Sequence, residues 1–180
     1  LETAVKYYQQ ALEITPDSSD VLNGLGITLN AMGQQEAAIN YYKQTLEIKP
    51  DFAEAHNNLG NSYKGLEQLD LAVKCYQRAL EISPNYADAH NNLGATLHAL
   101  RQLDDAAQSF ERALVINPNF VGAYSNLGNV YNDLGLVDAA LKSYHQALNI
   151  KPDDHDVRFN LSLLQLETGA LSEGFKNYEV

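Results

Sequence analysis

Hydrophobic positions along this chain follow the spacing of helices that come in pairs. Within residues 53–86, Ala55, Leu59 and Tyr63 recur every four positions, which places them on one face of a helix. A break at residues 65–68 follows, and a second apolar stripe then consists of Leu69, Ala72, Tyr76, Ala79 and Leu80. The pattern predicts a first helix and a second helix that run antiparallel.

The same pattern returns every 34 residues. The stretch AHNNLG at 55–60 is repeated unchanged at 89–94, which is typical of a stacked-repeat protein. Every proline obeys this period: Pro16, Pro50, Pro84, Pro118 and Pro152. Because proline cannot continue a helix, each one marks a turn between helices. The acidic or amide residue after each proline is expected to cap the next helix, namely Asp17, Asp51, Asn85, Asn119 and Asp153.

Glycines occupy one equivalent place inside the first helices: Gly26, Gly60, Gly94 and Gly128. A glycine inside a helix costs about 1 kcal/mol relative to alanine, so its recurrence predicts that a Cβ does not fit there. The facing small residues are expected to make this close contact: Ala38, Ala72, Ala106 and Ala140.

These residues resemble the tetratricopeptide repeat (TPR) family. Residues 53–86 carry its pattern in Leu59, Gly60, Tyr63, Ala72, Tyr76, Ala79 and Pro84, and residues 121–154 carry it in Leu127, Gly128, Tyr131, Ala140, Tyr144, Ala147 and Pro152. The resemblance implies an all-α fold, a right-handed α-solenoid (superhelix) of eleven helices in antiparallel pairs, with ligands in its concave groove.

The period divides the chain as a single solenoid over residues 1–180. It predicts a half repeat at 1–18, full repeats at 19–52, 53–86, 87–120 and 121–154, and a partial terminal repeat at 155–180. Both ends are expected to expose an apolar stacking face, which permits end-to-end self-association.

Charge and composition exclude several classes of function. With 23 acidic against 12 basic residues, the net charge is −11, and no basic stripe for nucleic acid is present. No apolar run approaches the roughly 18 residues of a membrane helix. Cys75 is the only cysteine, so no disulfide forms within the chain, and a cytoplasmic location is expected.

The candidate binding site is a column of asparagines on the first helices. A carboxamide offers a hydrogen-bond donor and an acceptor together, which matches the N–H and C=O of a peptide backbone. The predicted groove residues are Asn23, Asn57, Asn58, Asn61, Lys64, Asn91, Asn92, Asn126, Asn129, Asn132 and Asn160. The chain is therefore expected to be a protein–protein interaction scaffold that binds an extended peptide or protein segment.

Two other functions stay open. The column resembles the asparagine ladder of O-GlcNAc transferases, and LSEGFKNYE at 171–179 resembles the last repeat of bacterial TPR proteins that precede a glycosyltransferase-like domain. The chain would then be a substrate-recognition arm. Self-assembly through the chain ends is the other alternative. No enzymatic motif, metal site or cofactor is predicted, because His56 and His90 occupy packing positions and the other histidines lack ligand spacing.

Overall fold

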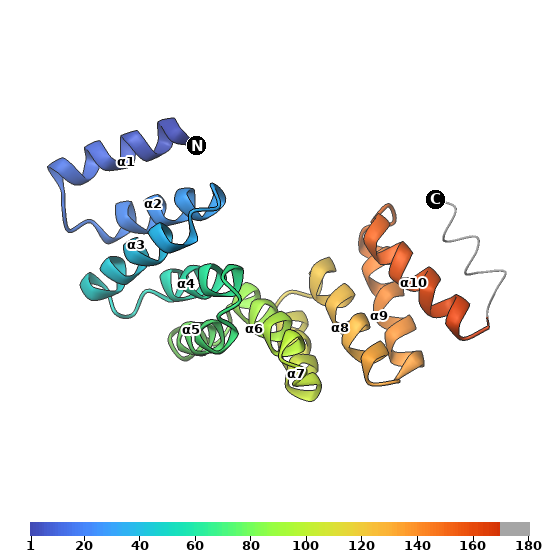
Figure 1. The fold of residues 1–180 in the computed structure, drawn as a ribbon. Helices are drawn as coiled ribbons and strands as arrows, with labels where there is room; N and C mark the ends of the chain where they lie inside the picture. The colour runs from blue at the N-terminus through green and yellow to red at the C-terminus, as the bar shows by residue number, and fades with distance from the viewer. Residues whose placement is uncertain (170–180) are drawn as a thin grey trace. The chain divides into compact units, whose positions relative to one another are not determined.

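The structure, a computed structural model, describes residues 1–169. Within that range the chain forms ten α-helices and no strand, which confirms the predicted all-α fold (Figure 1). They are α1 (Glu2–Ile14), α2 (Ser19–Ala31), α3 (Gln35–Ile48), α4 (Ala53–Gly65), α5 (Leu69–Ile82), α6 (Ala87–Ala99), α7 (Leu103–Ile116), α8 (Val121–Asp133), α9 (Val137–Ile150) and α10 (His155–Glu167). The eleventh expected helix lies outside the described residues.

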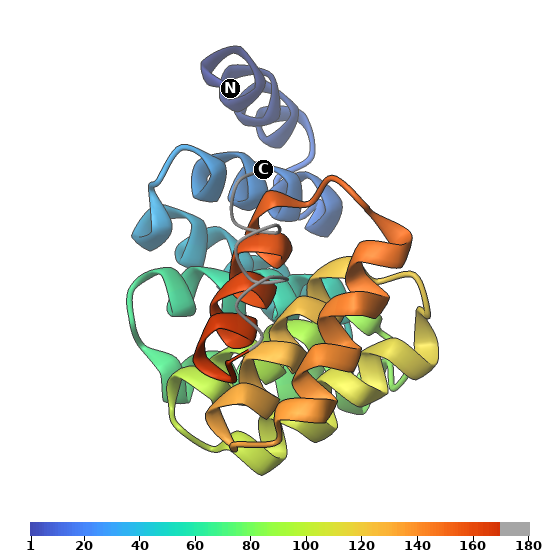
Figure 2. The ribbon, with the colours of Figure 1, turned by 90° about the vertical axis from the view of Figure 1, so that its right-hand side faces the viewer.

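The chain divides into two compact units, Leu1–Thr96 and a second that begins at Leu97. In the first unit α2 packs on α3, α3 on α4, and α4 on α5. In the second unit α8, α9 and α10 lie side by side (Figures 1 and 2). Even-numbered helices are the first helices of the repeats, and odd-numbered helices are the second helices. The predicted pairing of a first with a second helix is thereby confirmed.

The glycines inside first helices make room for buried tyrosine rings. A Cβ at Gly26, Gly60 or Gly128 would lie 2.6, 2.7 or 2.5 Å from a ring carbon of a second-helix tyrosine. These rings belong to Tyr42, Tyr76 and Tyr144, and each is at most 2% exposed. The expectation that a Cβ does not fit is confirmed at these three places, and the atoms nearest to that Cβ belong to the tyrosine rings and not to the facing alanines.

Each turn that follows a first helix in the described residues contains one residue in the left-handed conformation. Gly33, Gly135 and Gly169 adopt positive φ there, as do Glu67 at 58° and Arg101 at 61°. These positions follow the 34-residue period. Such a residue closes a helix C-terminus and usually is glycine, since a Cβ is strained in this conformation.

The expected capping by the residue after proline was wrong. The N-caps of α2, α4, α8 and α10 are the residues one position later: Ser18, Phe52, Phe120 and Asp154. The turn after each proline requires one further residue before the helix begins. Among these four caps only Asp154 uses its side chain, which accepts a hydrogen bond from the Val157 N–H at 3.2 Å.

Candidate functional site

All predicted groove residues lie on first helices. The first unit contains Asn23 on α2, Asn57, Asn58, Asn61 and Lys64 on α4, and Asn91 and Asn92 on α6. The second unit contains Asn126, Asn129 and Asn132 on α8, and Asn160 on α10. The helical period predicts this placement, and each unit is described below by itself.

In the first unit, asparagines of successive first helices bond to one another. Asn58 Nδ2 donates to Asn23 Oδ1 at 3.3 Å, and Asn92 Nδ2 donates to Asn57 Oδ1 at 3.0 Å. Asn23 and Asn57 are only 5% and 4% exposed. The helix face opposite the apolar stripe is therefore not free at these two positions, because their carboxamides are buried between neighbouring helices.

The other predicted residues of α4, Asn58, Asn61 and Lys64, are half-buried. Tyr76 reaches α4 from α5, and its hydroxyl donates to Asn61 Oδ1 at 2.8 Å. Burial raises the pKa of Tyr76, so its phenol stays protonated and remains a donor. Burial also lowers the pKa of the Lys64 ammonium group.

In the second unit three predicted asparagines meet at one cavity. Tyr144 donates its hydroxyl hydrogen to Asn129 Oδ1 at 2.7 Å, and Asn160 Nδ2 donates to the same oxygen at 3.2 Å. The cavity has a volume of about 300 Å³. It is lined by His98, Asn129, Asn132, Asp133, Tyr144, Asn160, Leu163 and Glu167.

One end of this cavity carries a charged cluster that the sequence analysis missed. Asp133 Oδ2 accepts hydrogen bonds from His98 Nε2 at 2.9 Å and from an Arg101 guanidinium nitrogen at 2.6 Å. The hydrogen bond from His98, followed by the charge of Arg101, holds the pKa of Asp133 below its usual value. The sequence spacing could have indicated this pair. His98 and Asp133 are 35 residues apart, and so are the bonded pairs Asn23–Asn58 and Asn57–Asn92.

The histidines and the cysteine considered as reactive groups, His56, His90 and Cys75, are partly buried in packing contacts. His56 and His90 are half-buried, not core residues, and each Nε2 contacts a proline carbonyl oxygen, of Pro50 at 2.9 Å and of Pro84 at 3.0 Å. Burial raises the pKa of Cys75 to about 11, so its thiol stays protonated and is a weak nucleophile.

Among residues 1–169 no three His, Cys, Asp or Glu side chains are grouped to hold a metal ion. Over the same range no helix combines the length and apolarity needed to cross a membrane.

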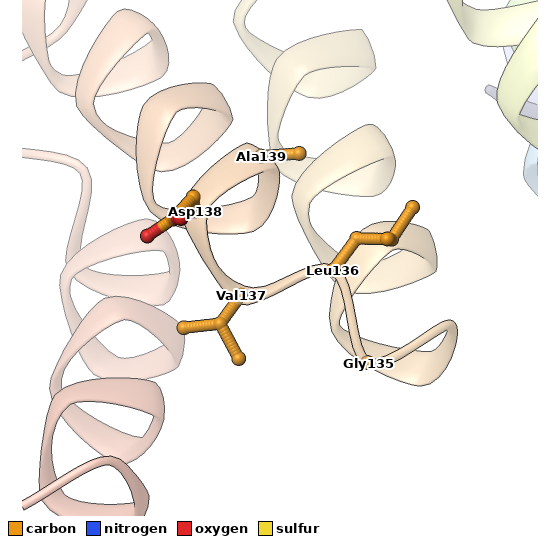
Figure 3. Close-up of a pocket in the computed structure, with 5 residues that line it drawn as sticks. All are labelled: Gly135, Leu136, Val137, Asp138 and Ala139. Carbon is orange, nitrogen blue, oxygen red and sulfur yellow. The ribbon is translucent and has the colours of Figure 1, made fainter.

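Two further cavities of the second unit contain no predicted residue. One of about 400 Å³ is lined by the contiguous segment Gly135–Ala139 at the α8–α9 turn, where Leu136 and Val137 point in opposite directions (Figure 3). The other, of about 270 Å³, lies among α7, α8 and α9 and is lined by residues including Tyr124, Tyr131 and Lys142. Neither cavity brings asparagine side chains together.

Sequence models of tetratricopeptide repeats match the chain over nearly all of its described length. One described as Tetratricopeptide repeat matches residues 53–86 and 87–120, and one described as TPR repeat matches 28–67 and 128–169. Another Tetratricopeptide repeat model matches 7–40 and 109–142. Together these matches run without a gap from residue 7 to residue 169.

No curated protein sequence matches the chain significantly. Solved structures share its fold. MamA is 24% identical with a TM-score of 0.79, and the match covers 86% of this chain and 91% of MamA. YrrB, described as a TPR protein with an unusual peptide-binding site, is 22% identical with a TM-score of 0.76, over 94% of this chain and 88% of YrrB. A thermophilic TPR protein of Thermus thermophilus is 26% identical with a TM-score of 0.74, over 90% and 89%. The repeats, the helix pairs and these matches show that the chain belongs to the tetratricopeptide repeat family.

Proposed function

We propose that this chain is a protein–protein interaction scaffold that binds an extended peptide or protein segment along its first helices and has no chemistry of its own. The observation that carries this proposal is the cavity of the second unit, where Asn129, Asn132 and Asn160 converge. Three carboxamides around one space offer several donors and acceptors to a main chain. The peptide-binding site named for YrrB, which shares this fold, supports the same reading.

The partner is expected to be held mainly through its backbone. Asparagines recur at one repeat position, Asn58, Asn92, Asn126 and Asn160, so their spacing is fixed by the stacking and not by the partner's side chains. The net charge of −11 favours basic segments in the encounter. A cytoplasmic location stays a prediction that rests on the single Cys75.

The test replaces the cavity residues Asn129, Asn132 and Asn160 together by alanine and measures binding of acetyl-(Ala-Ser)6-amide by NMR titration. This uncharged peptide probes backbone recognition alone. Loss of one hydrogen bond costs about 1 kcal/mol, and three carboxamides are removed, so affinity is expected to fall at least about tenfold. Unchanged affinity contradicts the proposal.

A matched control separates binding from stability. Asn129 and Asn160 also bond to each other between α8 and α10, so the thermal midpoint of each variant is measured beside its affinity. The control variant replaces the exposed residues Asn40, Asn85 and Asn149, which lie outside the first helices. It should bind the peptide as the unaltered chain does.

Self-association is a second candidate, favoured by one observation. On α1 the side chains of Tyr7 and Ile14 are 67% and 83% exposed, and such apolar surface is available to another copy. A monomeric solution mass at high concentration contradicts self-association.

The alternative that the chain is the substrate-recognition arm of a glycosyltransferase stays a prediction. Its motif at 171–179 lies outside the described residues, and sequencing the source gene beyond codon 180 tests this alternative.

A further inference from the structure

Two groove asparagines are held by tyrosines that approach from behind the first helix. Tyr76 bonds to Asn61 in the first unit, and Tyr144 bonds to Asn129 in the second unit, with O–O distances of 2.8 and 2.7 Å. Each tyrosine follows its asparagine by fifteen positions. Both rings are buried, 0% and 2% exposed, so their hydroxyls are directed by the surrounding core.

The glycines explain how the hydroxyls reach the groove side. The nearest ring carbons would lie 2.7 and 2.5 Å from a Cβ at Gly60 and Gly128, so each ring passes close against the helix backbone. Glycine therefore allows the phenol to extend past the first helix. The tyrosine, the glycine and the asparagine act as one structural group.

The hydrogen bonds fix which end of the carboxamide is available. Asn129 Oδ1 accepts from both Tyr144 and Asn160, which uses its two lone pairs. The Nδ2 group, with two N–H donors, points in a different direction from the same carbon. Since Asn129 lines the cavity, the group that remains for a ligand is a donor.

The sequence distinguishes the hydroxyl's role from the ring's role. In residues 87–120 the equivalent positions hold Ala95 and Phe110, so the carboxamide and the hydroxyl are absent together. In residues 19–52 the ring is kept as Tyr42, whereas the asparagine position holds Ile27. Ring burial is common to these repeats, and the bonded pair occurs where an asparagine is present to be oriented.

The structure assigns Tyr76 and Tyr144 as positioning residues that turn the amide nitrogens of Asn61 and Asn129 towards the bound segment. Both asparagines then donate hydrogen bonds to main-chain carbonyl oxygens, and Asn129, whose Oδ1 already accepts two hydrogen bonds, does not accept from main-chain N–H groups. The ligand at both places is thus a polypeptide segment recognised through its carbonyls. The inference rests on the proposed function and deepens it.

The test compares Tyr144→Phe, Asn129→Ala and the double variant in the full chain. Phenylalanine keeps the buried ring and removes only the hydroxyl. With acetyl-(Ala-Ser)6-amide as the probe, Tyr144→Phe should weaken binding about threefold to tenfold, the effect of one net hydrogen bond. In the Asn129→Ala background the same change should have no effect on affinity, because a positioning residue acts through its partner. An equal loss in both backgrounds overturns the inference.

A second probe tests the direction of the hydrogen bonds. The same peptide with N-methylated alanines loses alternate N–H donors and keeps its carbonyls. On addition of either probe, the side-chain amide proton signals of Asn129 should shift, and Tyr144→Phe should reduce the shift. If the side-chain amide proton signals of Asn129 shift with the unmethylated peptide and not with the N-methylated peptide, the inference is overturned.

Tyr42→Phe is the matched control. It removes the hydroxyl of the equivalent tyrosine in residues 19–52, where Ile27 stands at the asparagine position, so affinity should stay unchanged.

Failure of the inference and failure of the proposed function give different results. If the unaltered chain does not bind the first probe, the proposed backbone recognition is wrong, and the inference falls with it. If the chain binds and Tyr144→Phe binds equally well, only the positioning role is wrong.

Discussion

At the scale of single residues, the absence of a side chain at Gly60 determines how closely α4 and α5 pack. Gly60→Ala would place a Cβ 2.7 Å from the Tyr76 ring, which is fully buried. Overpacking of this kind costs about 1–3 kcal/mol, so the thermal midpoint measured by circular dichroism should fall. Gly65→Ala is the control: its Cβ would meet only the flexible Gln35 side chain at 3.4 Å, and alanine favours the helix. Equal thermal midpoints for the two variants would contradict the prediction, because they would show that the Tyr76 ring moves to make room for the Cβ.

Glu67 illustrates backbone strain at a single position. Its φ of 58° lies in the left-handed region, where the equivalent residues Gly33 and Gly135 have no Cβ. Glu67→Gly should therefore raise the free energy of unfolding by about 0.5–1 kcal/mol, measured by urea denaturation. Gln68→Gly is the control, because Gln68 has a φ of −83° and gains no relief. A midpoint that falls equally in both variants contradicts the assignment of strain.

The sequence predicted which asparagines lie on the first helices but not how they are bonded. Asn61 and Asn129 follow from helical spacing, since the apolar stripe defines the opposite face. Their bonds to Tyr76 and Tyr144 depend on how far a ring can reach beneath a glycine, and this distance arises only when two helices pack. The pairing of Asn58 with Asn23 depends likewise on the stacking of successive repeats.

At the scale of helices, α10 is stabilised by the cap at Asp154. Its carboxylate accepts from the Val157 N–H at 3.2 Å and contacts Lys151 Nζ at 3.0 Å. Asp154→Ala should lower the free energy of unfolding by about 1 kcal/mol at pH 7, measured by urea denaturation. Asp153→Ala serves as the control, because that side chain is 91% exposed and its ion pair contributes little.

The effect of Asp154 should depend on pH with a definite sign. The hydrogen bond from Lys151, together with that from Val157, lowers the pKa of Asp154 in the folded chain. A lowered folded pKa stabilises the protein above the unfolded pKa of about 4, and this contribution is lost as the pH falls through the folded value. The difference between the unaltered chain and Asp154→Ala should thus be complete at pH 7 and shrink below about pH 4. A difference that grows on acidification contradicts this cap.

Helix positions were well predicted, whereas helix ends were not. The prolines and the apolar stripes place every described helix within its expected segment, because both signals repeat with one period. The caps were assigned one residue early, at Asp17 and Asp51, since composition alone favoured acidic side chains. At Phe52 the N-cap has no polar side chain, so backbone turns rather than side-chain bonds begin that helix.

At the scale of the whole molecule, contacts are local, as expected for stacked repeats. Within each unit a helix packs on its neighbours in sequence, and the side-chain bonds between repeats span about one period. Such a chain gains stability repeat by repeat. The continuous array over residues 1–180 and its right-handed superhelix stay predictions from the repeat pattern.

Local contacts predict that stability differs among helices. In α1 no residue is fully buried, and Val5, Tyr8 and Leu12 pack only partly against the core of the first unit. In α5, by contrast, Ala72, Tyr76 and Ala79 are 0% exposed. Amide protons of residues 2–14 should therefore exchange at least about tenfold faster than those of residues 69–82, because local opening of α1 exposes little apolar surface.

Hydrogen exchange followed by mass spectrometry of the intact chain, at two protein concentrations, measures this difference. Fast exchange of α1 at both concentrations shows that its apolar side chains have no partner in another copy. Protection of α1 that appears only at the higher concentration means that a second copy covers Tyr7 and Ile14, which supports self-association. Equal protection of α1 and α5 at both concentrations contradicts the prediction, since it would require the chain to open as one cooperative unit despite its local contacts.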